Sequence, residues 1–122
     1  MRAQTKITLI ADDGEKFFGE GPWRLLKGVE ETGSLHQAAQ QMDMSYSKAI
    51  RILKRAEEVI GFPLTERTAG GLLGGGSRLT EQGKEWTERY ERYRDACVEA
   101  NRRLYLEFFP EQRQETSVSD GQ

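Results

Sequence analysis

Two short helical patterns separated by a brief break constrain the fold of this chain more than any other feature. Ser34 precedes the first pattern, and Gln37 lies three residues after Ser34, in the place of a capping-box partner. Ser45 precedes the second pattern, which runs to about Ile60 and ends at Gly61. The apolar residues that recur at helical spacing in the two patterns are Leu35, Ala38, Ala39 and Met42, then Ala49, Leu53, Ala56 and Ile60. The sequence therefore predicts two consecutive amphipathic helices that pack on a common core.

The second of these helices, predicted over residues 46–60, has a largely basic outer face. The polar residues opposite its apolar stripe, or flanking that side, are Ser47, Lys48, Arg51, Lys54, Arg55 and Glu58. Two helices joined by a short break, the second with a basic face, are typical of a helix-turn-helix. A plain three-helix core is the alternative that this pattern leaves open, because any small helical bundle contains short amphipathic helices.

Two further elements are predicted before this pair. Residues 5–19 alternate in polarity and contain Asp-Gly at 13–14, a dipeptide that readily adopts the positive φ angles of a tight turn, so we expect a β-hairpin there. Pro22 suits the first position of a helix, because its missing N–H would be unpaired there anyway. Gly33 ends this helix, whose apolar residues at helical spacing are Leu25, Leu26 and Val29.

A glycine-rich segment, "TAGGLLGGGSRLT" at 68–80, follows the helices between two expected short strands, 64–68 and 77–80. A phosphate-binding loop would need a lysine after its last glycine, where Gly76 and Ser77 stand instead. A linker would need a second core beyond it, whereas only one helix follows. We therefore interpret the segment as the tip of a hairpin, which after a helix-turn-helix makes a winged helix.

The last predicted helix, over residues 80–109, begins at Thr80 and has a narrow apolar seam. The seam residues recur at spacings of four, three, four, three and four, and are Trp86, Tyr90, Tyr93, Cys97, Ala100 and Leu104. Because these side chains are too large to remain exposed in a monomer, we expect them to form a dimer interface of the coiled-coil kind. We expect the polar residues 110–122, which begin with Pro110, to be a disordered tail.

Composition and charge restrict the class of protein. The net charge is −2, but residues 45–79 have six basic and three acidic side chains, so this part can bind a polyanion. No apolar run is long enough to cross a bilayer. The single cysteine, Cys97, is expected to be a buried apolar residue rather than an interchain disulfide, and fits a reducing, cytoplasmic compartment. His36 is the only histidine and has no partners at metal-ligand spacing, so we expect no metal, no cofactor and no enzyme activity.

With these residues in view, the chain resembles the winged helix-turn-helix of bacterial molybdate-responsive regulators of the ModE type, and more distantly the DNA-binding domains of LysR-type regulators. The resemblance covers roughly residues 20–110 and depends on "TGSLHQAA", "MSYSKA" and "PLTERTAGG…GGGSRLTEQG". It implies a homodimer that binds a palindromic operator through the helix beginning at Ser45. In the regulators of this family a pair of oxyanion-binding domains follows. Those domains have no counterpart in these residues, so the resemblance does not carry over a direct response to molybdate.

The expected fold is therefore α+β and mainly helical: a winged helix-turn-helix with an N-terminal β-hairpin over 1–79, a dimerisation helix over 80–109, and the tail. The residues expected to contact DNA from the second helix of the motif are Ser45, Tyr46, Ser47, Lys48, Arg51, Lys54 and Arg55. Those expected to do so from the wing are Arg67, Thr68, Gly70, Gly71, Gly74, Gly75, Gly76, Ser77 and Arg78.

Each assignment has a plainer alternative. Lys48 and Arg51 could form a solvated helix face, and Tyr46 could pack on the core side. Arg55 could pair with the nearby acidic residues Glu57 and Glu58. Thr68 and Ser77 would also fit an ordinary hairpin.

The sequence favours a DNA-binding transcriptional regulator, and the family resemblance points to molybdenum or tungsten genes. The alternative is a winged-helix interaction module that recruits a separate partner, such as an oxyanion-sensing chain. A third, weaker hypothesis is that the chain itself binds an oxyanion at a helix N-terminus near Ser34 or Ser45.

Overall fold

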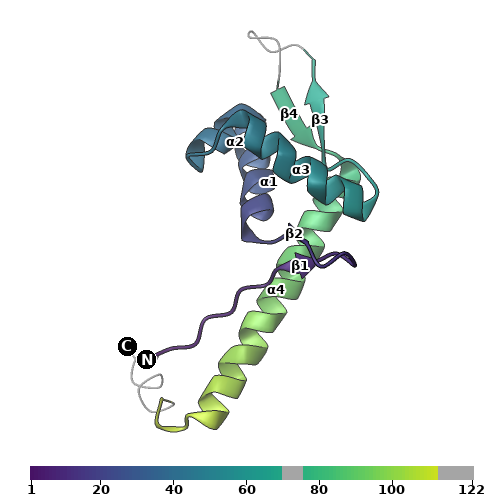
Figure 1. Cartoon of the computed structure of the whole chain (residues 1–122). Coiled ribbons are helices and arrows are strands. Elements are labelled where there is room, and N and C mark those ends of the chain that lie inside the picture. Colours follow the sequence, from purple (N-terminus) through teal and green to yellow (C-terminus); the bar gives the residue numbers. More distant parts are fainter. Residues whose placement is uncertain (70–75, 113–122) are drawn as a thin grey trace. The chain divides into compact units, whose positions relative to one another are not determined.

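The computed structural model describes residues 1–69 and 76–112, which form two compact units (Figure 1). One unit is Thr8–Tyr90, and the other combines Met1–Ile7 with the chain from Glu91 onward. The long helix α4, Glu81–Phe108, contributes residues to both. Within the described residues, no helix is long and apolar enough to span a membrane.

The first helix of the larger unit, α1, spans Glu20–Thr32 and begins earlier than Pro22, the residue predicted to open it. Gly19 is its N-cap, which places Pro22 third in the helix. The position remains within the first turn, where a missing N–H breaks no helical hydrogen bond. Gly33 ends α1 as predicted, in the left-handed conformation at φ 71°.

The two helices of the expected motif are confirmed, together with their caps. Helix α2 spans Leu35–Gln41, and the Gln37 N–H donates to the Ser34 hydroxyl over 3.2 Å. Helix α3 spans Tyr46–Ile60, and the Lys48 N–H donates to the Ser45 hydroxyl over 3.1 Å. Gly61 ends α3 at φ 89°. These serines satisfy backbone donors that the helices themselves leave unpaired.

Two antiparallel hairpins complete the larger unit. Strands β1 (Leu9–Ile10) and β2 (Lys16–Phe18) form the first, a shorter ladder than the sequence alternation suggested. Strands β3 (Thr65–Thr68) and β4 (Gly76–Leu79) form the wing, within one residue of the predicted bounds. Figure 1 shows the wing next to α1, α2 and α3.

Hydrogen bonds from backbone N–H groups attach the wing to the helices at three points. The Ser77 N–H donates to the Gly33 carbonyl over 2.8 Å, which ties β4 to the link between α1 and α2. The Leu64 N–H donates to the Glu57 carboxylate over 2.7 Å, which ties the start of the wing to α3. Thr80 caps α4 by accepting from the Gly83 N–H over 2.8 Å. The base of the wing is therefore fixed relative to α3.

An aromatic cluster joins the first hairpin to the beginning of α4. Phe18 is 1% exposed and contacts Trp86 and Tyr90 edge to face, with ring centroids 5.6 and 5.0 Å apart. Tyr90 is itself 3% exposed. Tyr90 is therefore buried within its own protomer and needs no partner chain to cover it, whereas Trp86 is half-buried.

Replacing Gly83 by alanine is expected to lower the free energy of unfolding by about 1–3 kcal/mol, the usual penalty of overpacking. Gly83 is buried, and a Cβ there would overlap the Leu64 carbonyl, a backbone group that cannot rotate away. Urea unfolding followed by circular dichroism measures the loss. Gly21→Ala is the control, because a Cβ at Gly21 meets nothing within 4 Å. Equal stability of the two variants would contradict the close contact.

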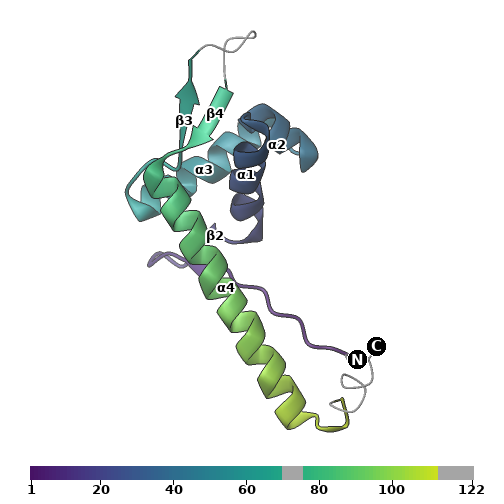
Figure 2. The same ribbon diagram turned by 180° about the vertical axis from the view of Figure 1, so that it is seen from behind.

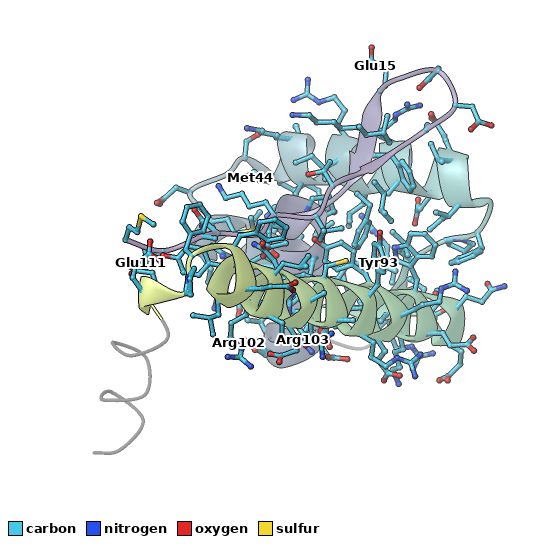
Figure 3. The ribbon with its side chains drawn as sticks, turned by 90° about the horizontal axis from the view of Figure 1, so that it is seen from below. Glu15, Met44, Tyr93, Arg102, Arg103 and Glu111 are labelled. Atoms are coloured by element: carbon cyan, nitrogen blue, oxygen red, sulfur yellow. The ribbon has the colours of Figure 1, made fainter. Side chains whose placement is uncertain are left out.

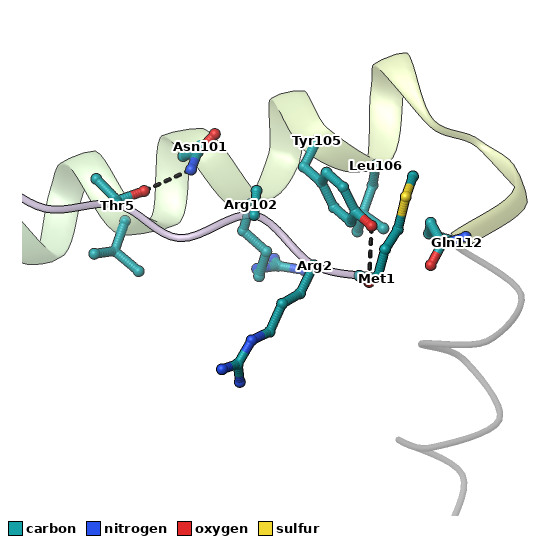
Figure 4. A pocket seen from close by; sticks show the side chains of 10 residues that line it. Met1, Arg2, Thr5, Asn101, Arg102, Tyr105, Leu106 and Gln112 are labelled. Carbon is teal, nitrogen blue, oxygen red and sulfur yellow. Dashed lines mark hydrogen bonds between the residues drawn. The ribbon is translucent and has the colours of Figure 1, made fainter.

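In the smaller unit, residues 1–7 run in an extended form beside the C-terminal half of α4 (Figure 2). The Asn101 side-chain amide donates to the Thr5 hydroxyl over 2.5 Å, and the Tyr105 hydroxyl donates to the Met1 carbonyl over 2.9 Å (Figure 4). The exposed faces of α4 in this unit include Tyr93, Arg102 and Arg103 (Figure 3). The N-terminal segment was not predicted to pair with α4, because no local pattern links residues so far apart in sequence.

Candidate nucleic-acid interface

The turn between α2 and α3 sets the direction in which α3 leaves the motif. Asp43 adopts a left-handed conformation at φ 52°, and the Met44 N–H donates to the Ala39 carbonyl over 3.0 Å. Asparagine and aspartate tolerate this conformation better than most residues. The turn therefore closes α2 tightly and starts α3 directly at its Ser45 cap.

One side of α3 is buried and the other is exposed and basic. Ala49, Leu53 and Ala56 are buried in the core. The exposed residues of the predicted DNA-binding set on this helix are Ser45, Ser47, Lys48, Arg51 and Lys54. Within residues 1–69 and 76–112, no carboxylate pairs with Lys48, Arg51 or Lys54. Three unpaired cations on one exposed helix face make a surface suited to a polyanion.

Tyr46 stacks on His36, with ring centroids 3.8 Å apart and planes 6° from parallel. Tyr46 is half-buried and His36 is exposed. The stack joins the first residue of α3 to the second residue of α2, so it supports the packing alternative for Tyr46. Sequence reasoning placed His36 correctly on the surface but missed its partner.

Arg55 has a different partner from the two acidic residues suggested by its sequence neighbourhood. Its guanidinium Nη2 donates to both carboxylate oxygens of Asp13, each over 3.1 Å. The pairing alternative with Glu57 and Glu58 is therefore wrong, because the turn of the first hairpin brings Asp13 to Arg55. The pKa of Asp13 lies below its ordinary value, mainly because the Glu15 N–H donates to its carboxylate and further because of Arg55.

The wing places its two arginines on opposite faces. In the register of the ladder, Glu66 lies opposite Arg78, and Arg67 lies opposite Ser77. Because side chains alternate along a strand, Arg67 and Arg78 point to different sides of the ribbon. Arg78 Nε donates to Glu66 Oε1 over 2.8 Å, while no described carboxylate pairs with Arg67.

The remaining wing residues fall into two groups. Thr68, Gly76 and Ser77 lie where the ladder ends, and a Cβ at Gly76 would overlap the Thr68 hydroxyl and press on the Gly33 carbonyl, so this position favours glycine. Gly70, Gly71, Gly74 and Gly75 lie outside the described residues. The predicted hairpin is thus confirmed at both strands, and its tip is untested.

No cluster of three or more candidate metal ligands occurs among the residues that the structure describes. The candidate site is the exposed basic surface of α3 and the wing, whose hydroxyl and cationic side chains can donate hydrogen bonds. Such groups bind phosphate and base edges.

Sequence reasoning missed both ion pairs that involve interface arginines. The antiparallel register could have suggested Glu66 opposite Arg78 if the ladder had been counted from the wing tip. Asp13 and Arg55 are 42 residues apart and have no such local signal.

Residues 22–84 match a protein family described as "Bacterial regulatory helix-turn-helix protein, lysR family". The chain is 37% identical over 68 residues to the transcriptional regulator ModE of Haemophilus influenzae, covering 56% of this chain and 27% of that protein. It is 36% identical over 67 residues to the molybdenum transport protein ModE of Azotobacter vinelandii, covering 55% and 25%. The chain thus spans about a quarter of the length of these curated relatives.

Among solved structures, the chain is similar to the protein in the crystal structure of the CbnR_DBD–DNA complex. The TM-score is 0.55 at 23% identity, and the match covers 69% of this chain and 91% of that one. At this identity the similarity shows the fold, which is that of a winged helix-turn-helix as predicted.

Proposed function

The chain belongs to the lysR family of bacterial regulatory helix-turn-helix proteins, and on that premise we propose that it is a homodimer that binds a palindromic DNA operator. The observation that supports DNA binding most directly is the exposed face of α3, where Lys48, Arg51 and Lys54 have no carboxylate partner in the described part of the chain. In this proposal α3 lies in the major groove and the wing contacts the adjacent backbone. A bacterial regulator that binds DNA acts in the cytoplasm, so the proposal places the chain there.

The residues have separate roles in this proposal. Ser47, Lys48 and Arg51 lie nearest the base edges, since the early part of such a helix enters the groove. Lys54 and Arg67 contact phosphates. A protein that neutralises phosphates releases counterions, so its affinity falls steeply with salt.

Titration of the purified chain against labelled duplex DNA at several salt concentrations tests this function. The proposal predicts binding whose logarithmic affinity falls linearly with the logarithm of salt, with a slope of about −0.9 for each phosphate contacted. Absence of binding even at low salt would overturn it and favour the interaction-module alternative.

Self-association is assigned to α4 beyond Tyr90. Tyr93 and Leu104 are 53% and 51% exposed, and Cys97 and Ala100, between them on the same side of the helix, are half-buried. Exposed apolar side chains aligned on one helix are typical of an interaction surface. Tyr90 is buried in the core and Trp86 packs against Phe18, so the seam proposed here consists of the other four residues.

Replacing Tyr93 by glutamate is expected to convert the dimer to a 13.9 kDa monomer at micromolar concentration, because a charge would be buried in the seam. Sedimentation velocity measures the change. Tyr93→Phe is the matched control and should remain dimeric, since it keeps the ring. A wild-type chain that sediments as a monomer, or a dimer unaffected by Tyr93→Glu, would contradict this interface.

We further propose that the regulated genes serve molybdenum or tungsten uptake or use, which the names of the ModE relatives support. A separate oxyanion-sensing chain is the partner that would add effector control. Its docking surface would be the exposed apolar residues of α4 outside the dimer seam, Val98 and Phe108, at 45% and 73% exposure.

A further inference from the structure

The arginines of the candidate interface fall into two classes. Arg51 and Arg67 have no carboxylate partner among the described residues, whereas Arg55 and Arg78 are each held by one. The holding carboxylates, Asp13 and Glu66, come from the turn of the first hairpin and from β3. Neither pair is buried, because the four side chains are between 33% and 69% exposed.

A carboxylate and a phosphate compete for the same guanidinium donors. Both accept charge-assisted hydrogen bonds, and both fit the planar fork of arginine. While Glu66 accepts from Arg78 Nε, that donor is unavailable to DNA, and the carboxylate charge repels any phosphate that approaches the same wing face.

We propose that Glu66 and Asp13 are specificity-determining residues, whose carboxylates hold Arg78 and Arg55 until DNA docked in the correct register displaces them. The inference rests on the proposed DNA-binding function. Loosely docked DNA forms contacts only with the unpaired cations Lys48, Arg51, Lys54 and Arg67. Correctly docked DNA also forms contacts with Arg55 and Arg78, which increases the difference in affinity between operator and random DNA.

Counterion release gives this proposal a measurable scale. With four unpaired cations the salt slope on random DNA is about −3.6 per protomer, and with all six it is about −5.4. Releasing Arg78 alone should therefore steepen the slope by about 0.9 for each protomer in contact.

The test measures the affinity of Glu66→Gln for a random-sequence duplex and for fragments that the wild-type chain selects from genomic DNA. We expect random-duplex affinity to rise by about threefold to tenfold at 0.1 M salt, with the steeper slope, while affinity for selected fragments changes less. Asp13→Asn should also raise affinity for the random duplex, because it weakens the hold on Arg55.

Glu99→Gln is the matched control. Glu99 is 50% exposed and accepts from Arg102 over 2.8 Å, so this variant removes the same charge from a similar pair that lies outside α3, the wing and the first hairpin. If Glu99→Gln raised affinity for the random duplex as much as Glu66→Gln does, the change in net charge alone would explain the effect. That result would overturn the proposal.

A double variant tests whether Glu66 acts through Arg78. In an Arg78→Ala background the gain from Glu66→Gln should disappear, and an undiminished gain there would also overturn the proposal. A wild-type chain that binds no DNA would reject the proposed function itself, whereas a binding wild type with an unchanged Glu66→Gln variant would reject only this inference.

Discussion

Replacing Phe18 by alanine is expected to lower the free energy of unfolding by about 3–5 kcal/mol, the range for removing a buried aromatic side chain. Phe18 is 1% exposed and its ring contacts those of Trp86 and Tyr90. The variant would leave a cavity lined by two large rings, which α4 and β2 cannot close without moving.

Guanidinium unfolding followed by tryptophan fluorescence measures this loss, because Trp86 lies in the cluster. Phe17→Ala is the comparison: Phe17 is only half-buried, and its ring lies 6.3 Å from that of Trp86, so a smaller loss is expected. A Phe18→Ala variant no less stable than Phe17→Ala would show that the cluster does not hold the hairpin to α4.

Replacing Arg51 by alanine is expected to weaken binding to the selected DNA site by about 1–3 kcal/mol for each half-site, or about fivefold to 150-fold. Arg51 is exposed on the face of α3 opposite the buried residues Ala49, Leu53 and Ala56, and its guanidinium has no carboxylate partner in the described chain. A free guanidinium at this position can donate both hydrogen bonds to one guanine.

Competition binding with selected and random duplexes separates base contact from phosphate contact. Arg51→Ala should lose affinity mainly for the selected site, whereas Lys54→Ala should lose it about equally for both. Arg24→Ala, an exposed arginine of α1 outside the interface, is the control and should bind like the wild type. Equal losses on both duplexes for Arg51→Ala would assign Arg51 to phosphate only.

Local signals predicted those parts of the fold that depend on a few neighbouring residues. Ser34 and Ser45 cap their helices and Gly33 and Gly61 end theirs, because capping and left-handed termination are decided within one helical turn. The wing strands followed from the glycines between them. Their order after the two helices was enough to predict the winged helix.

Contacts between distant segments could not be predicted in the same way. The periodicity of α4 showed that Trp86 and Tyr90 share a face with Tyr93, but not that Phe18 would cover the first two and leave the third exposed. Helical periodicity shows which residues share a face of the helix, but not which segment packs against that face. For the same reason the carboxylates considered as alternative partners of Arg55 were its helix neighbours Glu57 and Glu58, and not Asp13.

The ion pairs change how the interface sequence is interpreted. Counting basic residues over 45–79 treats Arg55 and Arg78 like Arg51, yet the structure gives them carboxylate partners and leaves Arg51 without one in its described part. Net charge alone therefore overstates the number of cations that are free to meet a phosphate.

Selection of bound fragments from genomic DNA, followed by sequencing, tests the central claim of a sequence-specific dimeric regulator most directly. The account predicts enrichment of one inverted-repeat motif, with half-sites about one helical turn of DNA apart, and its loss when the selection is repeated with Arg51→Ala. Recovery of fragments with no common motif, or of the same motif by both proteins, would contradict it.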